Sequence, residues 1–143
     1  MNSCALFEIT CFHLIVLCGL VPMLTQADAV GLPVPIGVWG GEHIGLVVTE
    51  TGATVEYDCA VGRVDGPLLR NREGHFEARG VHVFEPGGPR RPGDPAPTPY
   101  PARYQGWTDG SHMRLTVTLA STDNQVGTFS LDLGRQPRLE KCL

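Results

Sequence analysis

The sequence predicts an all-β protein, an antiparallel up-and-down barrel of about eight strands with low helix content. Apolar and polar residues alternate with a period of two, most clearly over residues 112–120, so one face of each expected strand is apolar. Turn signals such as Asp109-Gly110 separate the alternating stretches at short intervals. No stretch of ten or more residues combines helical periodicity with helix caps.

Eight strands and one short final piece follow from this alternation. We expect them near residues 36–40, 43–50, 53–60, 62–69, 75–84, 102–108, 112–120 and 126–133, with the last piece at 138–142. The first two segments are also compatible with one bent strand. Closing the sheet into a barrel hides both edges and places every apolar face on one core, while a two-sheet sandwich satisfies the same pattern and is the alternative.

The first 29 residues have the features of a signal peptide. Residues 9–24 form a mostly apolar run shorter than the roughly 20 residues needed to cross a bilayer, and the small residues Ala27 and Ala29 favour cleavage after Ala29. A start at Met23 instead would remove this export signal. We therefore expect a secreted or periplasmic protein without a membrane span after signal removal.

The expected mature chain is long enough for one domain. Residues 30–36 form an extended N-terminal segment, because Pro33 and Pro35 favour extended backbone, and residues 37–143 form the barrel. Three of the five cysteines lie in the leader (Cys4, Cys11 and Cys18), which leaves Cys59 and Cys142 as a pair. In an oxidising compartment this pair predicts a disulfide, with two separate buried thiols as the alternative.

The one long connection is the proline-rich loop at residues 85–101, which carries seven of the twelve prolines. Clustered prolines make it stiff and keep it out of a sheet ladder. It is interpreted either as a functional lid or docking strip, or as a tolerated surface excursion. The loop also contains the one close basic pair, Arg90-Arg91, and the chain is slightly acidic overall, so nucleic acid is not an expected partner.

Sequence patterns for catalysis or metal binding are not found. The histidines of the expected mature chain are scattered over four strands or strand ends, with no HExxH, CxxC or GxSxG motif. Ser111 and His112 are adjacent, but neighbours on a strand point to opposite faces and do not hold a nucleophile and a base together. We therefore expect no enzyme, no catalytic residues, no metal site and no cofactor.

Aromatic and polar residues near expected strand ends are the candidate ligand-binding residues. They are Trp39, His43, Tyr57, Arg103, Tyr104 and Trp107. In a small barrel such residues line a mouth that holds and orients a small apolar ligand. They serve equally well as core filler, and side-chain volume decides between the two uses.

Gly37-Val38-Trp39 resembles the G-x-W opening of lipocalins and avidins, both up-and-down barrels that bind small ligands. Longer stretches, including GVWGGEHIGL, PARYQGW and PRLEKCL, are similar to a group of small secreted bacterial proteins. The opening also resembles bacterial metalloprotease inhibitors of the small periplasmic barrel type, which enter the protease cleft with an extended N-terminal segment. Small-ligand binding is therefore the first expected function, and the alternatives are inhibition of a secreted protease through residues 30–36 or a structural envelope role.

Overall fold

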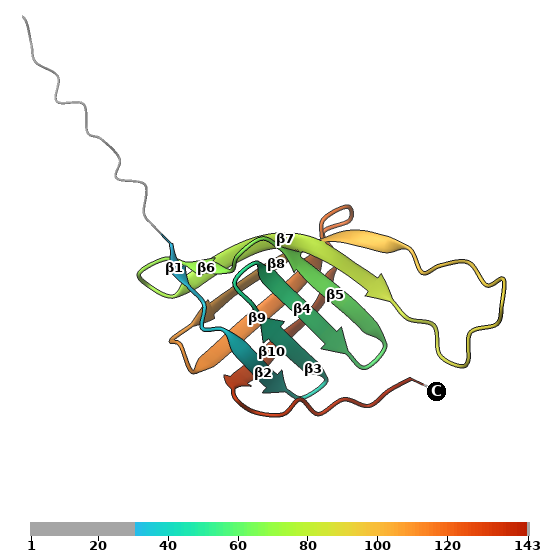
Figure 1. Cartoon of the computed structure of the whole chain (residues 1–143). Helices are drawn as coiled ribbons and strands as arrows, with labels where there is room; N and C mark the ends of the chain where they lie inside the picture. Colours follow the sequence, from blue (N-terminus) through green and yellow to red (C-terminus); the bar gives the residue numbers. More distant parts are fainter. Residues whose placement is uncertain (1–30, 143) are drawn as a thin grey trace, which may run out of the picture.

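The computed structural model describes residues 31–142, which form a closed antiparallel β-barrel (Figure 1). Its strands are β1 (Leu32–Pro33), β2 (Gly37–Gly41), β3 (Ile44–Val48), β4 (Gly52–Tyr57), β5 (Ala60–Asp65), β6 (Leu69–Arg70), β7 (His75–Phe84), β8 (Pro99–Thr108), β9 (His112–Leu119) and β10 (Gln125–Leu133). The predicted signal peptide at residues 1–29 and its three cysteines lie outside the described residues. Within residues 31–142, no helix has the length and apolar character needed to cross a membrane.

Eight strands close the barrel in up-and-down order, and this confirms the predicted fold class. The circle runs from β2 through β3, β4, β5, β7, β8, β9 and β10, and β10 returns to β2 at the pair Leu131 and Gly41. Since β7 also pairs with β8 along nearly its whole length, the sheet has no open side there and the sandwich alternative is wrong. The short strands β1 and β6 pair with each other, and β6 joins β7 at Arg70 and Phe76.

The structure confirms the first two predicted strands as separate, whereas tight turns change the bounds of the next two. The segments at 36–40 and 43–50 are separate strands joined by a two-residue turn, in which His43 adopts a positive φ of 65°. The predicted strand 53–60 ends at Tyr57, so Cys59 lies in the β4–β5 turn and not on a strand face. The predicted strand 62–69 divides into β5 and β6 around Gly66, whose φ is 80°.

The proline-rich loop is shorter than the predicted 85–101, because β8 already begins at Pro99. In an antiparallel strand the N–H and C=O of one residue point toward the same neighbouring strand. The Pro101 carbonyl accepts a hydrogen bond from the Ala120 N–H (2.8 Å), so the missing N–H of Pro101 also points away from β7. The β7–β8 ladder therefore continues to Pro99, opposite Val83, despite these prolines.

The predicted strand at 138–142 is wrong, because the C-terminal tail makes only one isolated bridge, between Arg138 and Glu42. The tail runs back across the outer face of β2 and β3, where the cross-strand partners Gly40 and Gly45 leave space for it. A Cβ at Gly40 would collide with the backbone of the tail, and one at Gly45 would press against the Pro137 ring.

The predicted disulfide is confirmed and fastens the tail to the β4–β5 turn. Cys59 and Cys142 are bonded, with their Cα atoms 5.4 Å apart and a sequence separation of 83 residues. The bridge is therefore a covalent link between the last described residues and the end of the barrel at which β4 turns into β5.

Side chains fill the middle of the barrel. Trp39 and Tyr104 are fully buried there, with Ile44, Leu46, Leu115, Val117 and Leu131 around them. The Trp39 indole Nε1 donates to the Pro35 carbonyl (3.0 Å), and the Tyr104 hydroxyl donates to the Val81 carbonyl (2.7 Å). Gly62 makes this second contact possible, because a Cβ there would collide with the Tyr104 hydroxyl.

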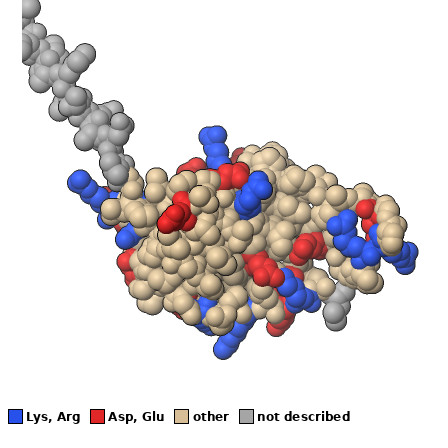
Figure 2. Space-filling view, viewed as in Figure 1, with Lys and Arg blue, Asp and Glu red and all other residues tan. Residues whose placement is uncertain are grey.

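The surface carries charges of both signs. Figure 2 shows Lys and Arg interspersed with Asp and Glu over the face in view, without a broad area of one sign. This distribution fits the near balance of acidic and basic residues in the sequence. A nucleic-acid surface usually carries a continuous basic patch.

Candidate functional site

A small, largely apolar pocket opens at the end of the barrel where β4 turns into β5. We call it the mouth pocket, and its volume is about 220 Å³. It is lined by His43, Tyr57, Asp58, Cys59, Ala60, His82, Phe84, Val126 and Phe129. A pocket of this size, below the usual range for drug-sized ligands, fits a compact molecule. No residue of the proline-rich loop lines it.

The long strands β7 and β10 build the wall of the mouth pocket, since they extend past the shorter strands beside them. Alternation along β7 directs His82 and Phe84 inward, toward Tyr57 from β4. The ring centroids of Tyr57 and His82 are 5.0 Å apart, and those of His82 and Phe84 are 4.5 Å apart, both in edge-on arrangements. The ring centroids of Phe129 and Tyr57 are 5.6 Å apart, in a tilted arrangement. The pocket therefore has an aromatic wall that contains one imidazole.

The imidazole of His82 is buried and has no hydrogen-bond partner within residues 31–142. The residue is 1% exposed, and neither Nδ1 nor Nε2 is paired. Burial lowers the pKa of His82, so the ring is neutral at physiological pH and offers one N–H donor and one acceptor nitrogen. More than about 90% of buried polar groups in folded proteins are hydrogen-bonded. Both ring nitrogens are closed off from solvent, so a molecule in the pocket reaches them only if a neighbour such as the half-exposed Phe84, whose ring contacts the imidazole, shifts aside.

The hydroxyl of Tyr57 is the second unpaired buried group beside the pocket. Burial raises its pKa far above the ordinary value, and the neighbouring Tyr104 phenol raises it further. The two phenols lie near each other without a well-formed hydrogen bond, because the Tyr104 hydroxyl is directed to Val81. Tyr57 therefore stays protonated.

His43 and Asp58 form the polar rim of the pocket. The His43 Nδ1 lies 2.6 Å from the Asp58 carboxylate, which also accepts the backbone N–H of Glu140 (2.7 Å). The Glu140 N–H is the main cause of the lowered pKa of Asp58, and His43 adds to it. An aspartate that orients a histidine is typical of hydrolase sites, but of the two pocket residues with a hydroxyl or sulfur group, Tyr57 stays protonated and Cys59 is held in the disulfide.

The described part of the chain contains no group of three or more His, Cys, Asp or Glu side chains placed to hold a metal ion. The mouth pocket thus combines aromatic and aliphatic side chains with one neutral imidazole, and it carries the His43–Asp58 pair at its rim.

The structure divides the six predicted ligand-binding residues among three places. His43 and Tyr57 line the mouth pocket, whereas Trp39 and Tyr104 lie in the filled middle of the barrel. Arg103 and Trp107 lie on the outer wall, where Arg103 pairs with Asp123 (3.0 Å). His82, Phe84, Val126 and Phe129 were missed. Gly80, His82 and Phe84 are every second residue of the strand and therefore share one face. This spacing is the sequence signal that places His82 on the inner face.

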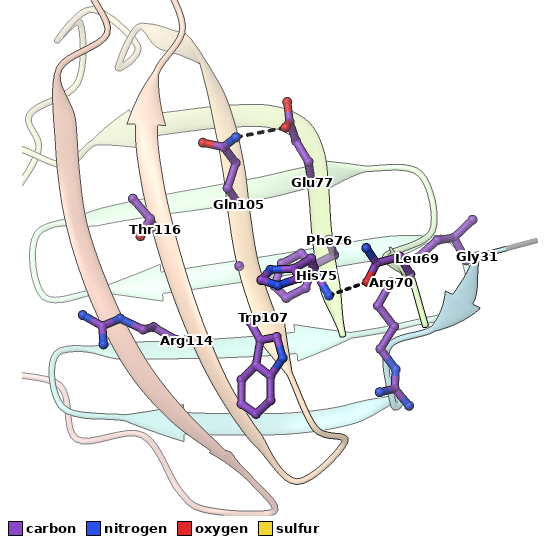
Figure 3. A pocket seen from close by; sticks show the side chains of 12 residues that line it. Gly31, Leu69, Arg70, His75, Phe76, Glu77, Gln105, Trp107, Arg114 and Thr116 are labelled. Carbon is purple, nitrogen blue, oxygen red and sulfur yellow. Dashed lines mark hydrogen bonds between the residues drawn. The ribbon is translucent and has the colours of Figure 1, made fainter. Parts of the chain in front are cut away.

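A larger depression of about 850 Å³ lies on the outer wall, beside β6 (Figure 3). We call it the outer groove, and its main side chains are Arg70, His75, Glu77, Gln105, Trp107 and Arg114. Trp107 is 39% exposed, and its Nε1 donates to the Glu73 carbonyl (2.8 Å). The Gln105 amide donates to Glu77 (2.9 Å).

Comparisons with protein-family models, with curated proteins and with solved structures find no match for this chain. The resemblances to lipocalins, avidins and protease inhibitors stay predictions, and function is argued from the geometry of the pockets.

Proposed function

We propose that the protein binds a compact, mostly apolar small molecule that carries a hydroxyl or carbonyl group, and that it does so in the mouth pocket. The observation that carries this proposal is the neutral, unpaired imidazole of His82 in a pocket whose other walls are largely apolar. A buried polar group without a partner costs about 1–3 kcal/mol. A ligand that supplies the missing hydrogen bond recovers much of this free energy on binding, in addition to burying its own apolar surface.

The filled middle of the barrel argues against a deep internal cavity of the kind in which lipocalins hold their ligands. Trp39 and Tyr104 occupy that volume, and both have their polar atoms paired. The ligand is therefore small and lies at the barrel end, with Tyr57 beneath it and Phe84 and Phe129 at its sides.

We further propose that binding takes place outside the cytoplasm, in a secreted or periplasmic protein. The Cys59–Cys142 disulfide supports this location, because disulfides form and persist in oxidising compartments. The predicted signal peptide is consistent with it.

Protease inhibition through residues 30–36 receives less support. Leu32 and Pro33 pair with β6, Val34 is 1% exposed and belongs to the core, and Pro35 accepts the Trp39 hydrogen bond. To enter a protease cleft, this segment would have to leave the barrel. No observation favours a structural envelope role.

Two probes of nearly equal shape test the proposal: para-cresol, which carries a hydroxyl, and toluene, which does not. We expect para-cresol to bind at least about tenfold more tightly in a titration followed by NMR, because it satisfies a buried group that toluene leaves unpaired. His82→Phe should abolish this difference. The control is His75→Phe, since His75 lies on the same strand with its side chain outward. Equal affinity for both probes, or an unchanged preference in His82→Phe, would contradict the proposal.

A further inference from the structure

The outer groove combines one exposed indole with guanidinium groups that have no acidic partner. Arg70 and Arg114 make no ion pair with any carboxylate of residues 31–142, unlike Arg63, Arg103 and Arg135, which do. In Figure 3 the Trp107 ring lies between the side chains of Arg114 and Arg70. Because the Trp107 Nε1 is engaged by the Glu73 carbonyl, the indole offers mainly its flat face to a ligand.

The strand register arranges the polar side chains of the groove in rows. His75, Trp107 and Arg114 are successive cross-strand partners on β7, β8 and β9. Glu77, Gln105 and Thr116 form the next row, which supplies a carboxylate, an amide and a hydroxyl. Neighbouring strands lie about 4.8 Å apart, a spacing comparable with the length of a pyranose ring.

A second depression of about 370 Å³ adjoins the outer groove, because Glu77 lines both. It contains Arg79 and Arg103, which face each other directly across β7 and β8. Like charges in this position destabilise a sheet unless an anion lies between or beside them. Asp123 neutralises Arg103, whereas Arg79 has no carboxylate partner among the described residues. Arg114, opposite Trp107, and the Arg79–Arg103 pair are therefore separated by four steps along the strands, roughly 13 Å, with the row that contains Glu77 between them.

We propose that the outer groove binds an acidic oligosaccharide of about two or three rings, with one pyranose face against Trp107 and the carboxylate or sulfate groups on Arg114 and on Arg70, whose guanidinium bonds only to the Thr108 carbonyl (3.4 Å) within the described chain. Planar side chains such as Gln105 and Glu77 bind sugar hydroxyls. A guanidinium group binds a carboxylate or sulfate through two parallel N–H···O hydrogen bonds. A flat aromatic face beside a row of such groups fits the alternation of apolar faces and hydroxyl edges on a sugar. The charge of the groove selects an acidic sugar over a neutral one.

The mouth pocket and the outer groove are separate sites, so the two proposals fail independently. The chain has two tryptophans, Trp39 in the core and Trp107 in the groove, which give two indole N–H resonances in an NMR spectrum. A ligand in the outer groove moves the Trp107 resonance and leaves the Trp39 resonance in place. Para-cresol in the mouth pocket does not move the Trp107 resonance.

The test is a titration of the ¹⁵N-labelled protein with trigalacturonate, a heparin-derived tetrasaccharide and neutral maltotriose. We expect a saturable shift of Trp107 with trigalacturonate, with the sulfated sugar or with both, and the arm that responds identifies the anionic group. Arg114→Gln should lower affinity at least about tenfold, because a charge-assisted hydrogen bond is lost. Affinity should also fall as salt is raised.

Arg63→Gln is the matched control, since Arg63 is an exposed arginine on β5, away from the groove, and its loss should leave affinity unchanged. Circular dichroism and an unchanged Trp39 resonance show that each variant is folded. The proposal is overturned if neither acidic sugar moves Trp107, if maltotriose binds as tightly as they do, or if Arg114→Gln binds as well as the unchanged protein.

Discussion

The middle of the barrel and its mouth are built from inward-facing residues of the same strands, yet they differ in how polar groups are treated. In the middle, the Trp39 indole and the Tyr104 hydroxyl each donate to a backbone carbonyl. At the mouth, the Tyr57 hydroxyl and both nitrogens of His82 have no partner within the described chain. The middle therefore pairs its polar groups, whereas the mouth leaves polar groups unpaired, and it is on this difference that the proposed ligand binding rests.

The largest expected effect comes from removing a large side chain in each region. Trp39→Ala should lower the free energy of unfolding by about 3–5 kcal/mol, since it leaves a cavity in a filled core. Phe84→Ala should cost less than about 1 kcal/mol, because Phe84 is 49% exposed at the mouth. Urea unfolding followed by circular dichroism measures both. Similar losses for the two variants would mean that the mouth is as tightly built as the middle.

A single-atom change made in both regions sharpens the comparison. Tyr104→Phe should cost about 1–2 kcal/mol, because it deletes a buried hydrogen bond to the Val81 carbonyl. Tyr57→Phe should be nearly neutral, since the Tyr57 hydroxyl makes no hydrogen bond to lose. The same unfolding experiment serves, and a larger loss in Tyr57→Phe than in Tyr104→Phe would contradict the assignment of partners.

Replacing the unpaired imidazole should separate stability from binding. His82→Leu is expected to leave the protein equally stable or to stabilise it by up to about 1–2 kcal/mol, because an unsatisfied buried polar group is removed. The same variant should lose its preference for para-cresol over toluene. His75→Leu, at an exposed position on the same strand, should change stability by less than about 0.5 kcal/mol and keep the preference. A strongly destabilised His82→Leu variant would show that the ring has a structural role.

The smallest expected effect is a change of stability with pH. Because the folded-state pKa of His82 lies below the unfolded value of about 6.5, the unfolded chain takes up a proton first as the pH falls. The stability contributed by neutral His82 is therefore present above about pH 6.5 and is lost progressively below it. Thermal unfolding between pH 8 and pH 5 should show a smaller loss in His82→Leu than in the unchanged protein.

The aspartates with lowered pKa values do not interfere with this comparison. The backbone N–H groups of His112 and Ser111 lower the pKa of Asp109 to about 2. For Asp109, as for Asp58, the stabilising contribution is lost only below about pH 4, where the unfolded carboxylates become protonated. If the unchanged protein and His82→Leu lose thermal stability identically between pH 8 and pH 5, His82 is excluded as the titrating group.

Much of the fold was predictable from the sequence, because alternation reports which face of a strand is buried and short turns report which strands are neighbours. The tail at 138–142 was not predictable in this way. Its position depends on the space left by Gly40 and Gly45 on the outer wall, and two glycines a few residues apart say nothing by themselves about what lies over them.

The candidate site was only partly predictable. Trp39 and Tyr57 were both expected to face inward, but alternation does not report how far along the barrel axis a side chain lies, and this decides whether it fills the core or lines the mouth. The aromatic surroundings of His82 come from Phe84, two residues along the same strand, and from Tyr57 on β4. The second contact is set by the register of β4, β5 and β7, which alternation does not report.

The most direct test of the mouth pocket is the ¹⁵N NMR spectrum of the His82 imidazole during a titration with para-cresol. We predict that one ring nitrogen of His82 shifts in a saturable manner as it gains a hydrogen bond, while the indole resonance of Trp39 stays in place. If the His82 nitrogens do not move when para-cresol is saturating, or if Trp39 moves instead, the ligand does not bind at the mouth.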